Sequence, residues 1–377
     1  MKAVKKLLII GLLLVIGSQL IACSKNNSST STPDKAVTAP TESVQQPENA
    51  ENETPVQGVD PITGETYPEV INVGIIEGGP ESAVLIQQNF LEGIDVKVNA
   101  VNYSAGTDIN NAVVSKDVDV ASFGSSPIAL GIANGIDYKA VFVSYLSGGN
   151  IEALAVKNDG GVSSVADLKG KTLGVPFGTT AHYALLNALE LAGLTAADVT
   201  LLDMGGADIV AAWTRGDIDG TYIWSPALDE CLKDGTILTN DGELADQGVI
   251  IPEIAVARTE FADKYPTLVN QYVKALIKVY EEISNNPDQS IQDVAAWEGA
   301  SQENARGQVE DNIWVSGEEQ LTGDYLGTTD VKGKLAQTLK TISDFHKAQG
   351  NISESPELSF FEDTVDPSFA EAALKSE

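Results

Sequence analysis

Cysteine and histidine are almost absent from this chain of 377 residues, which contains two of each. Zinc sites are built from clusters of these residues, and small disulfide-bonded folds need several cysteines. The sequence therefore predicts neither a metal centre nor a disulfide framework. It also lacks the G-x-S-x-G pattern of serine hydrolases and the glycine-rich Walker loop that binds nucleotide phosphates. We expect no catalytic activity and no cofactor.

Basic residues are scarce as well. The chain has 23 lysines and arginines against 54 aspartates and glutamates, which gives a formal net charge of −31. Such a chain is repelled by the phosphate backbone of nucleic acids, so DNA and RNA are excluded as partners. A small anionic ligand is not excluded, because an acidic surface can still surround a locally positive pocket.

The only long apolar run lies at the N-terminus, over residues 7–16, and it follows Lys2, Lys5 and Lys6. The run is too short to span a membrane and is typical of a secretory signal, which we place at residues 1–22. Cys23 directly follows Leu-Ile-Ala, an order that resembles a bacterial lipobox. We expect Cys23 to be lipidated and to anchor the protein to the membrane.

Residues 23–68 are rich in Ser, Thr, Asn, Gln, Pro and Glu and contain few large apolar side chains. A segment of this composition buries too little surface to offset the entropy lost on ordering. We therefore expect a disordered tether that holds a folded part outside the cytoplasm, at some distance from the cell membrane.

The folded part contains an internal sequence repeat, whose two copies are about one hundred residues apart. Residues 112–127 and 212–227 both run from a helical pattern, through an acidic turn, into a short apolar strand and then to a Ser-Pro pair. Asp119 lies in the first acidic turn and Asp219 in the second. With one gap, the two copies predict two similar lobes and a ligand site between the ends of their strands.

Apolar strand patterns alternate with helical patterns from about residue 70, which is typical of α/β proteins with mostly parallel sheets. We expect a continuous second lobe over residues 158–252 and a first lobe that comprises residues 69–157 and 253–377. Two crossings, near residues 153–157 and 253–257, would form a hinge about which the lobes close on a ligand. We expect the protein to be a monomer.

Four segments resemble the taurine-binding proteins of ABC importers. They are residues 123–127 (FGSSP), 149–154 (GNIEAL), 175–186 (VPFGTTAHYALL) and 211–227 (AAWTRGDIDGTYIWSPA). These proteins belong to a broader family of sulfonate, nitrate and thiamine-precursor binders. The resemblance covers most of the folded region and implies the type II periplasmic-binding fold, two α/β lobes joined by a two-strand hinge.

The resemblance also implies a function, the capture of taurine or a related aminosulfonate and its delivery to an ABC permease. The sequence leaves other ligands open: an aliphatic sulfonate, nitrate or a thiamine-pyrimidine precursor. It also leaves open a sensory lipoprotein that presents its closed form to a receptor, and a hydrolase that uses His182 with a serine and an aspartate.

Two pairs of hydroxyl residues are candidates for holding a sulfonate. Ser125 and Ser126 in one lobe, and Thr179 and Thr180 in the other, each lie where a strand turns into a helix. A sulfonate is permanently anionic and accepts hydrogen bonds from backbone N–H groups and hydroxyls at such turns. One pair alone would be an ordinary helix cap. His182, directly after the Thr pair, is expected to hydrogen-bond behind or beside the sulfonate.

An ammonium group needs carboxylates and aromatic faces. Glu81 and Asp219 are the candidate carboxylates, Tyr222 and Trp224 the candidate walls, and Glu152 a residue that orients this site or the hinge. Glu81 has a purely structural alternative, since an acidic residue in a first helical turn favours the helix dipole. Asp219 has one too, as a turn residue like its counterpart Asp119.

Overall fold

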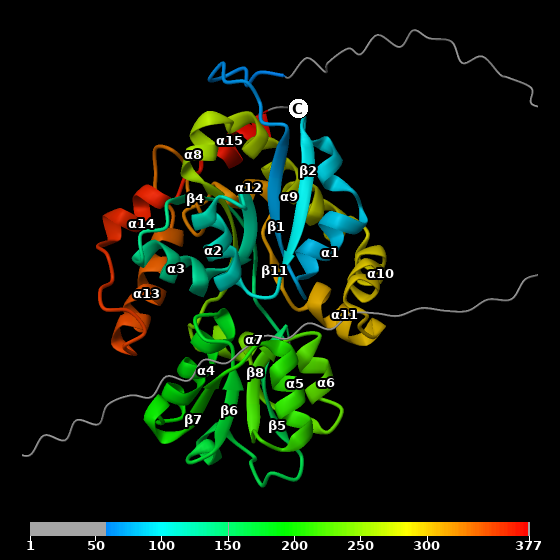
Figure 1. Cartoon of the computed structure of the whole chain (residues 1–377), viewed down its shortest axis with the longest axis vertical. Coiled ribbons are helices and arrows are strands. Elements are labelled where there is room, and N and C mark those ends of the chain that lie inside the picture. The colour runs from blue at the N-terminus through cyan, green and yellow to red at the C-terminus, as the bar shows by residue number, and fades with distance from the viewer. Residues whose placement is uncertain (1–57, 150, 376–377) are drawn as a thin grey trace, which may run out of the picture. The chain divides into compact units, whose positions relative to one another are not determined.

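The computed structural model describes residues 58–149 and 151–375 of the chain. The predicted signal peptide, Cys23 and most of the predicted tether lie outside these residues. Residues 55–377 form one unit, which carries all the elements below (Figure 1). Within the described residues, no helix has the length and apolar composition that a membrane span requires.

The first lobe contains a six-stranded sheet in the order β11-β4-β10-β3-β1-β2. Its strands are β1 (Val70–Ile76), β2 (Lys97–Tyr103), β3 (Val120–Gly124), β4 (Tyr138–Leu146), β10 (Pro252–Arg258) and β11 (Ile313–Trp314). β1, β2 and β3 are parallel, whereas β10 runs antiparallel to both β3 and β4. The chain therefore returns from the second lobe into the middle of the first sheet.

Helices before and after the second lobe build the rest of the first lobe. The early helices are α1 (Pro80–Gln87), α2 (Gly106–Ser115) and α3 (Ser125–Ala133). The late helices are α8 (Thr259–Lys264), α9 (Pro266–Asn285), α10 (Pro287–Glu298), α11 (Gln302–Glu310), α12 (Gly317–Gln320), α13 (Leu335–Ala348), α14 (Leu358–Thr364) and α15 (Ser368–Lys375). α9 is amphipathic as the sequence predicts, and its apolar face from Leu268 to Ile283 is buried.

The second lobe, green in Figure 1, contains a five-stranded sheet in the order β7-β6-β8-β5-β9. Its strands are β5 (Glu152–Lys157), β6 (Thr172–Val175), β7 (Thr200–Asp203), β8 (Gly220–Trp224) and β9 (Gly235–Asn240). Its helices are α4 (Thr180–Leu191), α5 (Gly206–Arg215), α6 (Ala227–Cys231) and α7 (Asp241–Ala245). β6, β7 and β8 are parallel, and β5 is antiparallel to β8 and β9.

The structure differs from the expected boundaries at two points. β5 pairs only with strands of the second lobe, so that lobe begins near residue 152 and not at residue 158. Residues 58–68 are not part of a tether. Val59 bridges to Thr66, Tyr67 is buried, and Asp60 accepts a hydrogen bond from the backbone N–H of Thr267. The change in composition at residue 69 therefore does not mark the start of the fold.

The two lobes repeat each other at an offset of one hundred residues. β1 pairs with β3 at Val73 and Val120, and β6 pairs with β8 at Leu173 and Gly220. The helices α2 and α5 begin at Gly106 and Gly206. The repeated unit is therefore longer than the sequence match indicates, since it also includes β1 in the first lobe and β6 in the second.

Candidate functional site

A cavity lies between the two lobes at the ends of β1, β3, β6 and β8, where the repeat places a ligand site. It has a volume of about 540 Å³, part of it open to solvent. Helix N-termini, side chains of both sheets and the two hinge crossings all contribute to its wall. The two crossings lie between β4 and β5 and just before β10, not near residues 153–157 and 253–257 as the sequence predicted, because both of those segments are paired inside a sheet. The crossings contribute Ser147, Ile151 and Ile251 to the wall, and Glu253 follows in β10.

Four helices begin at the cavity wall. Gly79 is the N-cap of α1, Gly124 is the N-cap of α3, Thr179 is the N-cap of α4, and Gly106 is the first residue of α2. The first N–H groups of a helix have no partner inside the helix, and the helix dipole makes that end positive. α1, α2 and α3 also lack a side-chain cap. This part of the cavity is therefore suited to an anion.

Carboxylates also line the cavity, close to these helix N-termini, since Glu253 is paired with Gly124 across the β10–β3 ladder. Glu152 at the start of β5 and Glu253 in β10 face the cavity, and Glu77 lies at its rim, where it accepts a hydrogen bond from Ser104. None of the described residues that line the cavity is lysine, arginine or histidine. The aromatic rings of Tyr145 and Trp224 complete this side. Carboxylates and aromatic faces together are suited to a cation such as an ammonium group.

Glu152 has one satisfied and one unsatisfied oxygen. The Thr180 hydroxyl donates a hydrogen bond of 2.5 Å to Oε1, whereas Oε2 is buried and has no partner. Burial raises the pKa of Glu152 well above its usual value, and the nearby Asp241 raises it further. A buried acceptor without a donor is costly, so this position favours a ligand that donates.

Asp241 supports Glu152 from behind. Tyr222 donates a hydrogen bond of 2.7 Å to Oδ1 of Asp241, and Ser147 donates one of 2.6 Å to Oδ2. Burial nevertheless raises the pKa of Asp241 to about 7. Ser147 belongs to the hinge and Asp241 to the second lobe, so this hydrogen bond ties the crossing to the site.

Glu253 and Glu81 form a second acidic pair, in the first lobe. Burial raises the pKa of Glu253 well above its usual value, and the neighbouring Glu81 raises it further. The Ser122 hydroxyl donates a hydrogen bond of 3.1 Å to Glu81, whose pKa burial raises to about 7. Two buried carboxyls this close together disfavour simultaneous ionisation, and a cation beside Glu253 would relieve this.

The lobes touch closely around the cavity. A Cβ atom placed on Gly124 of the first lobe would lie 2.4 Å from Cγ2 of Thr180 in the second. A Cβ atom on Gly78 would lie 2.0 Å from the backbone oxygen of Ser225, and Gly78 also has a φ of +75°, which favours glycine. The structure therefore describes the lobes in a closed arrangement.

The predicted site residues divide into three groups. Thr179, Thr180, Glu152 and Trp224 line the cavity. Those that lie behind its wall are Glu81, Ser125, Ser126, His182 and Tyr222, all of them buried. Asp219 lies at the far end of β8 from the cavity.

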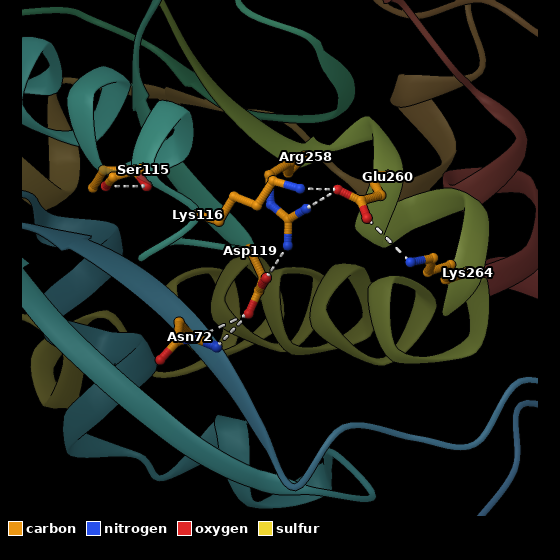
Figure 2. Close-up of polar contacts among 8 residues, drawn as sticks. Asn72, Ser115, Lys116, Asp119, Arg258, Glu260 and Lys264 are labelled. Carbon is orange, nitrogen blue, oxygen red and sulfur yellow. Dashed lines mark hydrogen bonds and ion pairs between the residues drawn. The ribbon is translucent and has the colours of Figure 1, made fainter.

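The position of Asp219 corrects its predicted role as a ligand for the ammonium group. Asp219 precedes β8 whereas Trp224 ends it, so the two lie at opposite ends of the strand. Its carboxylate accepts a hydrogen bond from the backbone N–H of Thr172 and pairs with Lys171. The counterpart Asp119 binds Asn72 and Arg258 in the same way (Figure 2). These contacts support the alternative interpretation, in which Asp219 is a structural turn residue.

Tyr222 is likewise not a wall of the cavity. Tyr222 is completely buried, and its hydroxyl donates its hydrogen bond to Asp241. Because side chains alternate along a strand and Trp224 sits at the strand end, Tyr222 lies one step deeper on the same face. It acts on the site through Asp241.

The two histidines meet behind the helix N-termini. The Ser126 hydroxyl lies 2.8 Å from Nε2 of His346, and the backbone N–H of Gly178 donates to Nδ1 of His182. The two imidazole rings lie 6.5 Å apart. Burial lowers the pKa of each to about 4, so both are neutral at physiological pH. Ser125 is buried beside them, with an Oγ that has no partner.

Sequence reasoning missed Glu77, Tyr145, Ser147 and Glu253. Glu253 carried a usable signal, since it is an acidic residue at the start of the strand that returns through the predicted hinge. Glu77 carried one too, since it directly follows the first predicted strand. No pattern marks Tyr145 and Ser147, which enter the cavity through the end of β4 and the crossing after it. Within the described residues, no cluster of His, Cys, Asp and Glu could hold a metal ion.

Comparisons with known proteins agree with this geometry. Residues 86–290 match the family model described as NMT1/THI5 like. The taurine-binding periplasmic protein of Escherichia coli K12 is 30% identical over 279 residues, which cover 72% of this chain and 84% of that protein. A putative aliphatic sulfonates-binding protein of the same strain is 29% identical over 194 residues, 48% of this chain and 60% of that protein.

Solved structures show the same fold. The alkanesulfonate-binding protein SsuA from Xanthomonas axonopodis pv. citri, bound to MOPS, has a TM-score of 0.66 at 20% identity and covers 80% of this chain and 99% of its own. The periplasmic aliphatic sulphonate binding protein SsuA from Escherichia coli has a TM-score of 0.63 at 20% identity and covers 78% and 97%. The predicted periplasmic-binding fold is confirmed. The chain belongs to the NMT1/THI5-like family, and it is a solute-binding protein rather than an enzyme.

Proposed function

We propose that this protein captures taurine or a close aminosulfonate between its lobes and delivers it to an ABC permease. Its working place would be outside the cytoplasm, like that of its periplasmic relative, with Cys23 as a lipid anchor. The observation that carries the proposal is that one cavity wall combines helix N-termini with carboxylates and aromatic rings. Taurine is a zwitterion with a sulfonate at one end and an ammonium group at the other, and these two kinds of wall group match its two ends.

The sulfonate would lie against the helix N-termini at Gly79, Gly106, Gly124 and Thr179. Backbone N–H groups would donate to its three oxygens, as they do to other anions at helix N-termini. The side chains of Ser125, Ser126 and His182 would support this half from behind, where the structure buries them.

The ammonium group would lie against Glu152 and Glu253, with Tyr145 and Trp224 beside it. The unpartnered Oε2 of Glu152 would accept one of its hydrogen bonds. An alkanesulfonate or nitrate ion offers no donor to these carboxylates and brings a negative charge to an acidic wall without lysine, arginine or histidine. The cavity therefore favours an aminosulfonate over the purely anionic alternatives.

A thermal-shift screen of the full chain tests the proposal. A ligand that binds only the native state stabilises it and so raises the melting temperature. The stabilisation is about 2.7 kcal/mol when the ligand concentration is one hundred times the dissociation constant. We expect a rise with taurine and smaller or no rises with ethanesulfonate, nitrate and glycine. A rise with nitrate or ethanesulfonate alone would contradict the proposed ligand class.

A further inference from the structure

A second cavity lies directly outside the first. It has a volume of about 900 Å³, part of it open to solvent, and it lies between the N-terminal part of α5 and the start of α6. Its apolar wall consists of Ala207, Val210, Ile223, Pro226 and Ala227.

Only two residues line both cavities, Glu77 and Trp224. Glu77 comes from the first lobe, and Ser104 holds it with a hydrogen bond of 3.1 Å. Trp224 comes from the second lobe, at the end of β8. These two side chains form the partition between the inner and the outer cavity.

The indole of Trp224 closes this partition by contact with the opposite lobe. A Cβ atom on Gly78 would lie 3.0 Å from Cδ1 of Trp224, so the ring packs directly on the backbone of the first lobe. The equivalent position in the other half of the repeat is Gly124, which has no side chain to place in the cleft. The indole is therefore the bulky element that separates the two cavities.

Trp224 also lies beside Glu152, the proposed partner of the ammonium group, with which it is paired across the β5–β8 ladder. A substituent on the amine nitrogen of the ligand would therefore point at the indole, and beyond the indole it would meet the apolar wall of the outer cavity.

We propose that Trp224 sets the upper size limit of the ligand at its amine end, and that its removal joins the two cavities into one site for N-substituted aminosulfonates. This inference rests on the proposed function, because it takes the amine end to lie at Glu152. It assigns to the outer cavity the apolar substituents that the intact protein excludes.

Calorimetry on the full chain tests the inference with taurine and 2-(cyclohexylamino)ethanesulfonate, which differ only in the ring on nitrogen. We expect the unmodified protein to bind the cyclohexyl compound at least 100-fold more weakly than taurine. Trp224→Ala should bind it at least tenfold more tightly than the unmodified protein does, and taurine a few-fold more weakly. Trp224→Leu should show the same change in selectivity with a smaller gain, and its folding is less at risk because leucine keeps apolar bulk.

Phe360→Ala is the control, because Phe360 is an exposed aromatic residue that lines neither cavity, so its loss should leave the selectivity unchanged. If the folded Trp224 variants bind the cyclohexyl compound no better than the unmodified protein does, the size-limit inference is wrong. If the unmodified protein binds no aminosulfonate at all, the proposed function fails instead, so the two failures can be told apart.

Discussion

Asp119 and Asp219 hold the same position in the two lobes. Each carboxylate accepts a hydrogen bond of 2.9 Å from the backbone N–H of a residue 47 positions earlier, Asn72 in one case and Thr172 in the other. Asp119 therefore ties β1 to the start of β3, and Asp219 ties the start of β6 to the start of β8. The two aspartates are structural anchors at the ends of the sheets that face away from the cavity.

The two anchors differ in burial, which predicts different contributions to stability. The side chains of Asp119 and its partner Arg258 are 7% and 14% exposed, against 37% and 30% for Asp219 and Lys171. Asp119→Ala leaves a buried guanidinium without its main partner and should lower the free energy of unfolding by about 3 kcal/mol. Asp219→Ala should cost about 1 kcal/mol, because water screens the exposed pair. Urea denaturation measures both, and equal losses would contradict this account.

Glu152 should discriminate between ligands with and without an amine. Glu152→Gln keeps the shape of the side chain but removes the charge that an ammonium group would meet. A hydrogen bond to a charged group contributes about 1.5–3 kcal/mol, so taurine should bind roughly 10- to 150-fold more weakly while the affinity for ethanesulfonate changes little. Asp219→Asn is the control, and calorimetry should find its affinity for taurine unchanged. If Asp219→Asn lost more affinity for taurine than Glu152→Gln does, the ammonium group would have to lie at Asp219 and this account would be wrong.

Closure of the lobes should depend on the absence of a side chain at Gly124. This glycine has a φ of −61°, which alanine adopts without strain, so the substitution acts mainly through the contact with Thr180. Gly124→Ala should weaken taurine binding about tenfold, since overpacking typically costs 1–3 kcal/mol. Gly323→Ala, where a Cβ atom meets nothing within 4 Å, is the matched control. X-ray scattering should show that taurine compacts the control and not the Gly124 variant; compaction of both would refute the closure argument.

The buried carboxyls predict how stability depends on pH in the unliganded protein. Burial raises the pKa of Glu81, Asp241 and Glu298 to about 7, so the folded state holds more protons than the unfolded state between the usual carboxyl pKa and about pH 7. Stability from these groups is therefore lost as the pH rises through this window. Glu152 and Glu253, whose pKa values are also raised, act in the same direction.

The two histidines oppose this trend. Burial lowers the pKa of His182 and His346 to about 4, so their contribution is lost as the pH falls from 6.5 towards 4. More carboxyls have a raised pKa than histidines have a lowered one. The unliganded protein should therefore melt at a higher temperature at about pH 5 than at about pH 7.5. A higher melting temperature at the upper pH would show that the carboxyls are ionised without a ligand.

Taurine should reverse part of this dependence. An ammonium group favours the ionised form of Glu152 and Glu253, so binding should release protons wherever their raised pKa values keep the free carboxyls protonated, and it should become tighter as the pH rises through that range. Calorimetry in buffers of different ionisation enthalpy measures the proton release. Proton uptake, or an affinity that falls between about pH 5 and pH 7.5, would contradict the assignment of these carboxyls to the amine.

The sequence predicted the two lobes, the returning strand and half of the site, and particular residues show why. The repeat identified the strand ends, and Thr179, Thr180 and Trp224 lie there. The prediction that Asp219 contacts the ligand was wrong, because Asp219 and Trp224 are five residues apart in one motif and therefore lie at opposite ends of an extended strand. Tyr145 and Glu253 come together only through the pairing of β10 with β4, which joins residues about one hundred positions apart.

The contribution of the late helices was also beyond sequence reasoning. His346 in α13 reaches Ser126 in α3, a contact between residues 220 positions apart. Periodicity identifies the buried face of such a helix but not the segment that it covers. The support behind the helix N-termini therefore emerges only from the assembled lobe.

The central claim is that the cavity binds both the sulfonate and the ammonium group of an aminosulfonate. Titration calorimetry of the full chain with taurine and with ethanesulfonate tests this claim most directly. The two ligands share the sulfonate and differ by the amine. The account predicts that taurine binds at least tenfold more tightly, because only taurine satisfies Glu152 and Glu253. Binding of ethanesulfonate with no heat from taurine would contradict it.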